Sequence, residues 1–173
     1  MTLKLSRLDD SRVDESFEVL NQVAKWIQSQ GRRQRIANTT LEVYRKWQSE
    51  KSNFIVTEDD KIVGIVTLRT ETLVDWPDQV AIGPIQMIRA LATHPEHRGK
   101  GIGEFAMREV ILQSANGNPV YLDCVSGFLP EYYANLGFSV VQEQIRDYGE
   151  EGSFPITLMR YAVGLSETDV GNQ

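Results

Sequence analysis

The stretch Ala90–Gly103, ALATHPEHRGKGIG, decides the fold of this chain. It begins as a short apolar strand, turns at Pro95 and continues as a glycine-rich loop that leads into a helix. Gly99, Gly101 and Gly103 leave room for backbone amides to approach an anion closely. A helix start adds unpaired N–H groups and the positive end of the helix dipole. The stretch therefore predicts a phosphate-binding site at a helix N-terminus.

Two nucleotide-binding motifs compete with this interpretation, and neither is complete. The P-loop needs Ser or Thr directly after its Gly-Lys pair, but Gly101 follows Lys100 here. The dinucleotide fingerprint Gly-x-Gly-x-x-Gly needs a third glycine at the position of Glu104. A nucleotide-binding enzyme therefore stays as a secondary hypothesis.

Composition limits the class of protein and of site. The 173 residues are 41% hydrophobic and 24% charged, which is typical of one soluble globular domain. A net charge of −6 argues against a nucleic-acid binder. One cysteine, Cys124, and two histidines exclude a disulfide framework and predict no metal site. The chain shows no apolar segment long enough to cross a membrane and no signal-peptide pattern, so a cytoplasmic location is expected.

Hydrophobic periodicity predicts an α/β (α+β) arrangement in a single domain over residues 1–173, ending in a polar tail of about eight residues. A capping-box spacing, Thr39-x-x-Glu42, marks the start of the second helix. A long loop is expected over 71–84. Strands are predicted at 3–5, 54–56, 62–68, 85–93, 120–125, 138–141 and 156–163, and the other helices at 11–31, 102–115 and 131–136.

A second motif, Tyr132–Phe138 (YYANLGF), follows the predicted strand at 120–125. Together with Arg98-x-x-Gly101-x-Gly103 it resembles the GCN5-related N-acetyltransferase (GNAT) family, whose signatures are Arg/Gln-x-x-Gly-x-Gly/Ala and Phe/Tyr-Tyr-x-x-x-Gly-Phe. The motifs cover about residues 85–138, and the element order matches over nearly the full chain. The resemblance implies the acyl-CoA N-acyltransferase fold, a mixed central sheet flanked by helices.

The resemblance also implies roles for particular residues. Tyr133 would be catalytic, protonating the departing CoA thiolate, because a phenol with a pKa of about 10 is protonated at neutral pH. A bulge would separate the strand from its neighbour, so that backbone groups pair with the pantetheine arm and one N–H polarises the thioester carbonyl. The alternative for Tyr133 is a core aromatic. The residues expected to bind acetyl-CoA are Leu91, Ala92, Thr93, Arg98, Gly99, Lys100, Gly101, Ile102, Gly103 and Ser126, the last standing where relatives often carry Asn.

Other reactive side chains leave alternatives open. A proton acceptor for the amine is expected among Glu71, Asp75, Asp123 and His94, or as a chain of waters. Cys124 is interpreted as a small buried strand residue, with a role as acyl-carrying nucleophile as the alternative. The arginines at 32, 33 and 35 are interpreted as solvent-facing, with contact to substrate or CoA phosphate as the alternative.

These observations lead to one main hypothesis and a rival. The chain is expected to move an acetyl group from acetyl-CoA to a primary amine by direct transfer in a ternary complex. The rival is a non-catalytic acyl-CoA-binding sensor or docking domain on the same fold. The expected partners are acetyl-CoA and an amine acceptor, a small molecule rather than a protein, with no nucleic acid and no membrane, and with a homodimer as the oligomer found among relatives. The sequence does not identify the acceptor.

Overall fold

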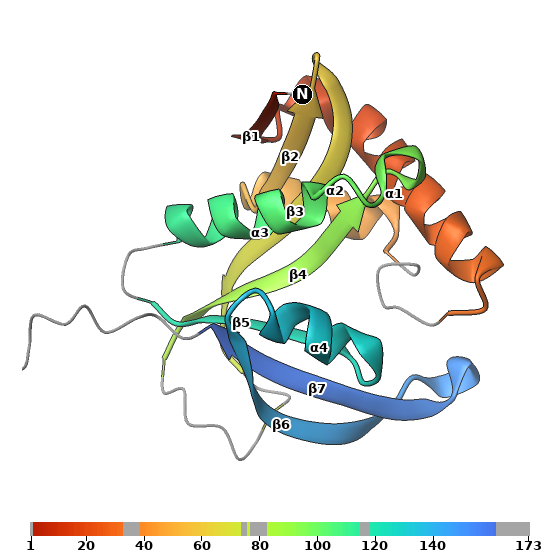
Figure 1. The fold of residues 1–173 in the computed structure, drawn as a ribbon, viewed down its shortest axis with the longest axis vertical. Coiled ribbons are helices and arrows are strands. Elements are labelled where there is room, and N and C mark those ends of the chain that lie inside the picture. Colours follow the sequence, from red (N-terminus) through yellow and green to blue (C-terminus); the bar gives the residue numbers. More distant parts are fainter. Residues whose placement is uncertain (1, 33–38, 74–75, 77–82, 115–117, 162–173) are drawn as a thin grey trace, which may run out of the picture.

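The computed structural model describes residues 2–32, 39–73, 76, 83–114 and 118–161 of the chain. Its helices and strands follow the predicted order, so the predicted fold class is confirmed (Figure 1). The strands are β1 (Leu3–Arg7), β2 (Asn53–Glu58), β3 (Lys61–Glu71), β4 (Ile85–Thr93), β5 (Val120–Val125), β6 (Phe138–Asp147) and β7 (Ser153–Tyr161). The helices are α1 (Val13–Ser29), α2 (Leu41–Ser49), α3 (Ile102–Gln113) and α4 (Phe128–Ala134), with short 3-10 turns η1 (Asp10–Arg12), η3 (Pro95–His97) and η4 (Gly149–Glu151).

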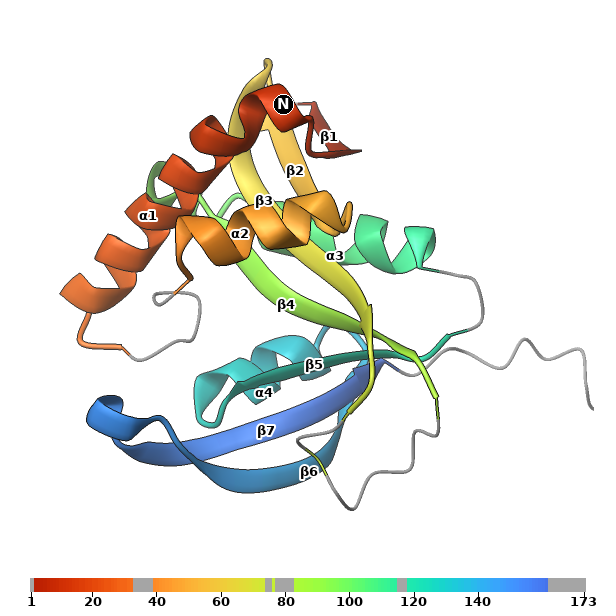
Figure 2. The ribbon, with the colours of Figure 1, turned by 180° about the vertical axis from the view of Figure 1, so that it is seen from behind.

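The described strands form one seven-stranded sheet between two layers of helices, in the order β1-β2-β3-β4-β5-β7-β6. Helices α3 and α4 lie on one face, and α1 and α2 cover the other (Figures 1 and 2). Apolar side chains pack in both layers, with Met107 of α3 and Leu20 of α1 almost fully buried. Among the described helices, none is long and apolar enough to cross a membrane.

The sheet opens between its two central strands. β4 and β5 run parallel and pair over three residues, Gln86–Ile88 with Val120–Leu122. Arg89 is then an extra residue on β4, because β3 pairs with Ile88 and Ala90 through consecutive residues. Beyond this bulge the described part of β4 pairs with β3, whereas β5 pairs with β7. The bulge and the short pairing leave one edge of β4 free of β5.

Two helices begin elsewhere than predicted. The cap of α2 is Thr40 and not Thr39, because the Thr40 hydroxyl accepts a backbone N–H of the first turn at 3.2 Å. Helix α4 begins at position 128 rather than 131. Gly127, with a φ of 126°, forms its N-cap, and Pro130 is tolerated in a first turn that needs no N–H donor from it. The N-cap residues therefore determine where α2 and α4 begin.

The last two strands are longer than predicted. β6 continues to Asp147, well past the predicted end at 141, because an edge strand with polar residues on both faces carries no apolar alternation to detect. β7 begins at Ser153 rather than 156 and pairs with β6 along its whole length. Residues 162–163 of the last predicted strand, residue 115 at the end of the predicted helix 102–115, most of the loop at 71–84 and the predicted polar tail lie outside the described residues.

Candidate functional site

A cavity of about 350 Å³ lies where β4 and β5 separate. Three walls come from β4, from the glycine loop with the first turn of α3, and from α4, while α1 contributes Val23 and Ile27. Tyr133 lines the same cavity. Lys100 and Ser126 are not among the lining residues. The predicted donor-binding residues that line it are Leu91, Ala92, Thr93, Arg98, Gly99, Gly101, Ile102 and Gly103.

The glycine loop presents backbone amides to this cavity. Gly99 and Gly101 have φ angles of 75° and 76°, a conformation that favours glycine. Gly101 is the N-cap of α3 and supplies no side-chain cap. The amide of Phe105 donates to the Gly101 carbonyl at 2.9 Å, and the amides that precede it in α3 have no acceptor within the helix. The arrangement can therefore hold an anion by backbone donors and the helix dipole.

Two glycines let the start of α3 approach its neighbours. A Cβ atom on Gly64 of β3 would lie 2.9 Å from Cγ2 of Ile102, so the absence of a side chain there seats the first turn of α3 on the sheet. A Cβ atom on Gly103 would lie 2.9 Å from the hydroxyl oxygen of Tyr132. The Tyr132 hydroxyl therefore lies directly against the first turn of α3, at the same wall of the cavity.

Tyr133 comes from α4 and is partly buried. Its ring packs edge-on against Tyr132 at 5.1 Å and against Phe138 at 6.1 Å between ring centroids. Burial raises the pKa of the Tyr133 hydroxyl well above 10, with smaller contributions from Cys124 and neighbouring groups. The hydroxyl consequently keeps its proton at neutral pH and can donate a hydrogen bond into the cavity.

The structure weighs against the nucleophile interpretation of Cys124. The thiol is buried on β5, and burial raises its pKa to about 12, with a further contribution from Asp123. A thiol that stays protonated is a poor nucleophile, because the thiolate is the reactive form. Cys124 is not among the residues that line the cavity.

Two candidate proton acceptors are held by arginines at the point where β4 and β5 part. Asp123, with its side chain 5% exposed, accepts from Arg89 and from Arg146 at 3.3 Å each. Glu71 pairs with Arg89 and also with Arg69, the latter at 3.4 Å. Both carboxylates are thus engaged in ion pairs on the face of the sheet opposite α3. Neither lines the cavity.

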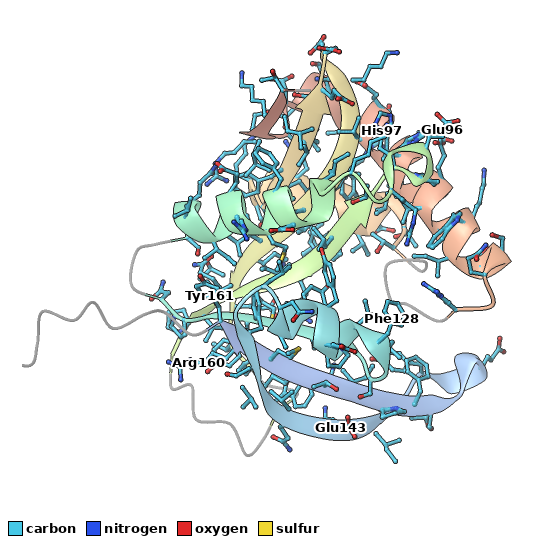
Figure 3. The ribbon with its side chains drawn as sticks, viewed as in Figure 1. Glu96, His97, Phe128, Glu143, Arg160 and Tyr161 are labelled. Carbon is cyan, nitrogen blue, oxygen red and sulfur yellow. The ribbon has the colours of Figure 1, made fainter. Side chains whose placement is uncertain are left out.

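The other two candidates lie elsewhere. His94 precedes η3, and its Nδ1 accepts the amide of Glu96 at 3.3 Å. Figure 3 shows Glu96 and His97 in the turn between β4 and α3, where His97 Nδ1 lies 3.4 Å from a Glu58 carboxylate oxygen. Asp75 lies outside the described residues. No cluster of three or more metal-binding side chains occurs in the part of the chain that the structure describes.

Ser126 does not line the cavity, and its side chain contacts two other strands. Its hydroxyl donates to a carboxylate oxygen of Glu143 at 2.7 Å and lies 2.7 Å from the hydroxyl of Thr157. It does not cap α4, which starts after Gly127 without a side-chain cap. The hydroxyl of Ser126 is therefore engaged with β6 and β7.

The cavity is also lined by residues outside the predicted set, three of which lie at the end of α1, just after it and at the start of α4. Trp26 near the end of α1 and Phe128 at the start of α4 were not singled out in the sequence, and Arg32 was interpreted as solvent-facing. Figure 3 shows Phe128 at the end of α4 that lies nearest the C-terminal end of α1. Trp26 directly precedes Ile27, which belongs to the apolar stripe of α1. A large aromatic residue beside that stripe was the one feature of the sequence that could have pointed to Trp26 as a lining residue.

Comparisons with known proteins agree with this geometry. The family model described as "Acetyltransferase (GNAT) domain" matches residues 50–140. Among curated proteins, none matches this sequence.

Solved structures share the fold. The ribosomal-protein-S18-alanine N-acetyltransferase of Escherichia coli is similar with a TM-score of 0.70 and 14% identity, over 99% of this chain and 100% of that chain. A GNAT acetyltransferase of Streptococcus agalactiae gives a TM-score of 0.73 at 9% identity, over 90% of this chain and 94% of that one. NAA60 of Arabidopsis thaliana, solved with a bisubstrate analogue, gives 0.65 at 15% identity, over 92% and 97%. At these identities the likeness concerns the fold alone.

Proposed function

Because the chain belongs to the GNAT acetyltransferase family, which uses acetyl-CoA, we propose that it transfers the acetyl group directly to a primary amine within a ternary complex. The observation that carries this proposal is the shared cavity. Strand β4, the glycine loop and Tyr133 all border it. One cavity therefore offers both backbone amides for the phosphates of a donor and a hydroxyl for its thioester.

Each wall has a distinct task in this mechanism. The amides at the start of α3 bind the donor's diphosphate, and the free edge of β4 at Leu91–Thr93 pairs with the amide-containing arm of the donor. A backbone N–H of the same edge stabilises the negative charge that develops on the thioester oxygen. Both binding regions border one cavity, which supports a long, extended thioester as the donor.

The chemical step is the displacement of a thiolate by a neutral amine. The amine nitrogen forms the new C–N bond, the C–S bond breaks, and the electron pair leaves with sulfur. Tyr133 donates its hydroxyl proton to that sulfur, and the ammonium proton of the acceptor leaves to solvent before the attack. The nitrogen loses a second proton to water once the C–N bond has formed, and Tyr133 regains its proton from water. Glu71 and Asp123, the described candidate carboxylates where β4 and β5 part, are held in ion pairs. Water is therefore the proposed carrier of the ammonium proton.

The proposals for the acceptor, the oligomeric state and the cellular location rest on composition and on the family resemblance. We propose a small cationic amine as acceptor, and a net charge of −6 supports it by attracting cations to the surface. A cytoplasmic location is supported by the single cysteine, a buried free thiol. A homodimer is proposed from the family resemblance.

The test is a steady-state assay of CoA thiol release with a panel of amines. Tyr133→Phe should lower kcat by about 100-fold or more, because general acid catalysis contributes about 10²–10⁴ in rate, while the Kd for CoA stays unchanged. Tyr132→Phe is the matched control, as it removes the neighbouring hydroxyl from the same helix. Unchanged kcat in Tyr133→Phe, or an equal fall in Tyr132→Phe, would remove Tyr133 from the mechanism.

A further inference from the structure

Four side chains form a stacked row across the mouth of the cavity. The Arg98 guanidinium lies 3.5 Å from the ring centroid of Trp26. The Arg32 guanidinium lies over Phe128 at 4.7 Å and 5.9 Å from the Trp26 ring. All four side chains border the cavity, and the row connects the end of α1 with the start of α4.

No carboxylate among the described residues neutralises the two arginines of this row. In the described residues, neither Arg32 nor Arg98 has an ion-pair partner within 4.0 Å. Glu104 is the one carboxylate among the described residues that line the cavity, and it is engaged by Arg108 at 2.7 Å. Partial burial and the repulsion of Arg32 both lower the pKa of Arg98. Two like charges beside one indole ring are therefore held together without a counter-ion from the described chain.

An arrangement of this kind suits a multiply charged anion. Guanidinium groups bind phosphate through paired hydrogen bonds in a fixed plane, and an aromatic face holds that plane while leaving the N–H edge available. Both arginines remain exposed at the mouth, so an anion in the cavity can reach them. The glycine loop lies along the same wall and supplies the backbone amides.

We infer that Arg32, held on Trp26 beside Arg98, is a second phosphate-binding cation of the donor site and that Trp26 is its positioning residue. This inference rests on the proposed function, and it adds α1 to the elements that recognise the donor. It makes the site selective for a phosphorylated thioester over the same thioester without phosphate. Arg98 and Arg32 then bind from two sides of one anion, the first from the glycine loop and the second from the segment that follows α1.

The experiment compares three donors: acetyl-CoA, acetyl-dephospho-CoA, which lacks only the 3′-phosphate, and S-acetyl-pantetheine, which lacks the adenosine and every phosphate. Arg32→Ala should raise the KM for acetyl-CoA by about 10- to 100-fold, because a hydrogen bond to a charged group contributes about 1.5–3 kcal/mol. The KM for S-acetyl-pantetheine and kcat at saturation should stay unchanged. The dephospho donor then assigns the contact, to the diphosphate if its KM also rises and to the 3′-phosphate if it does not.

Three further variants sharpen the comparison. Arg32→Lys keeps the charge but loses the planar stack, so it should recover part of the affinity. Trp26→Leu keeps an apolar side chain against the α1 core and should reproduce the donor-selective rise in KM with little change in Tm. Arg45→Ala is the matched control, since it also removes one exposed arginine. Arg45 lies on α2, where it pairs with Asp14 of α1 at 3.0 Å.

An equal rise in KM for the phosphate-free donor would overturn the inference, because it would place Arg32 on the thioester or acceptor side. No rise for any donor, or a rise as large in Arg45→Ala, would overturn it as well. Calorimetry separates this from a failure of the proposed function: a wild-type protein that does not bind CoA refutes that function, whereas equal CoA binding by wild type and Arg32→Ala refutes the role of Arg32 alone.

Discussion

Gly64 lies in β3 beneath the first turn of α3, and the substitution Gly64→Ala tests whether that close approach sets the donor site. The new Cβ atom would stand 2.9 Å from Ile102 Cγ2 and 3.3 Å from the carbonyl oxygen of Ala92. Carbon atoms pack best at about 3.5–4.0 Å, so the first contact is too short by roughly 0.6–1.1 Å. Ile102 is 1% exposed and cannot turn away, so the first turn of α3 must shift.

The cost follows from two opposing terms. Overpacking a well-packed core costs about 1–3 kcal/mol. Replacing glycine by alanine in a strand without a positive φ gains about 0.5–1 kcal/mol, and Gly64 is not among the positive-φ glycines. The net loss lies between about 0 and 2.5 kcal/mol, and its midpoint of about 1.3 kcal/mol corresponds to a fall in Tm of about 3–5 °C for a chain of this size. Because the shifted turn carries the phosphate-binding amides, the KM for acetyl-CoA should rise as well.

Thermal melts and donor kinetics on a double-mutant cycle check this reasoning. Ile102→Leu removes the Cγ2 methyl but keeps the volume, so in the Gly64→Ala background it should restore both Tm and KM toward the values of Ile102→Leu alone. A Gly64→Ala protein with wild-type Tm and KM would refute the steric argument. So would a double mutant no better than Gly64→Ala.

Two other outcomes are expected from buried charged and titratable groups. Asp123→Asn leaves Arg89 and Arg146 without their shared carboxylate in a nearly buried position, and urea unfolding should show a loss of about 3–5 kcal/mol; a loss below about 1 kcal/mol would mean that solvent replaces the pair. Burial raises the pKa of Cys124 from 9.0 to about 12 and that of Tyr44 from 10.0 to about 12, so the folded state keeps protons that the unfolded state releases. The stability that these two groups contribute should therefore be fully present below about pH 9 and be lost from there toward pH 12, and Cys124→Ala should make the alkaline fall shallower; an identical alkaline profile in that variant would count against the thiol.

The sequence predicted best what local patterns determine. Strand β4, the glycine loop and α3 were located because an apolar run, a proline turn and three glycines each restrict the backbone in their own way. Tyr133 and most of the predicted donor-binding residues lie around one cavity because the loop and α4 follow adjacent strands. The bulge at Arg89 was expected from the family resemblance alone, since a register shift leaves no mark in one strand's own residues.

Contacts between distant elements were beyond such patterns. The side chains of Trp26, Arg32 and Phe128 meet because α1 ends beside the start of α4, which depends on how the helices pack on opposite sides of the opening. Ser126 was expected at the donor, but β6 extends far enough for Glu143 to engage its hydroxyl. The length of β6 depends on pairing with β7 and not on its own polarity, so no local pattern predicts the contact between Glu143 and Ser126.

The three-residue pairing of β4 with β5 has a consequence for the whole molecule. The groups β1–β4 and β5–β7 are each continuous antiparallel ladders, but they share a short seam. A donor arm that pairs with the free edge at Leu91–Thr93 would extend that seam and act as a ligand-supplied strand. At a donor concentration of about 100 times Kd, mass action adds about 2.7 kcal/mol to the free energy of unfolding. The cohesion of this sheet would then rise and fall with the supply of acetyl-CoA, and hydrogen exchange along the edge of β4 would report it.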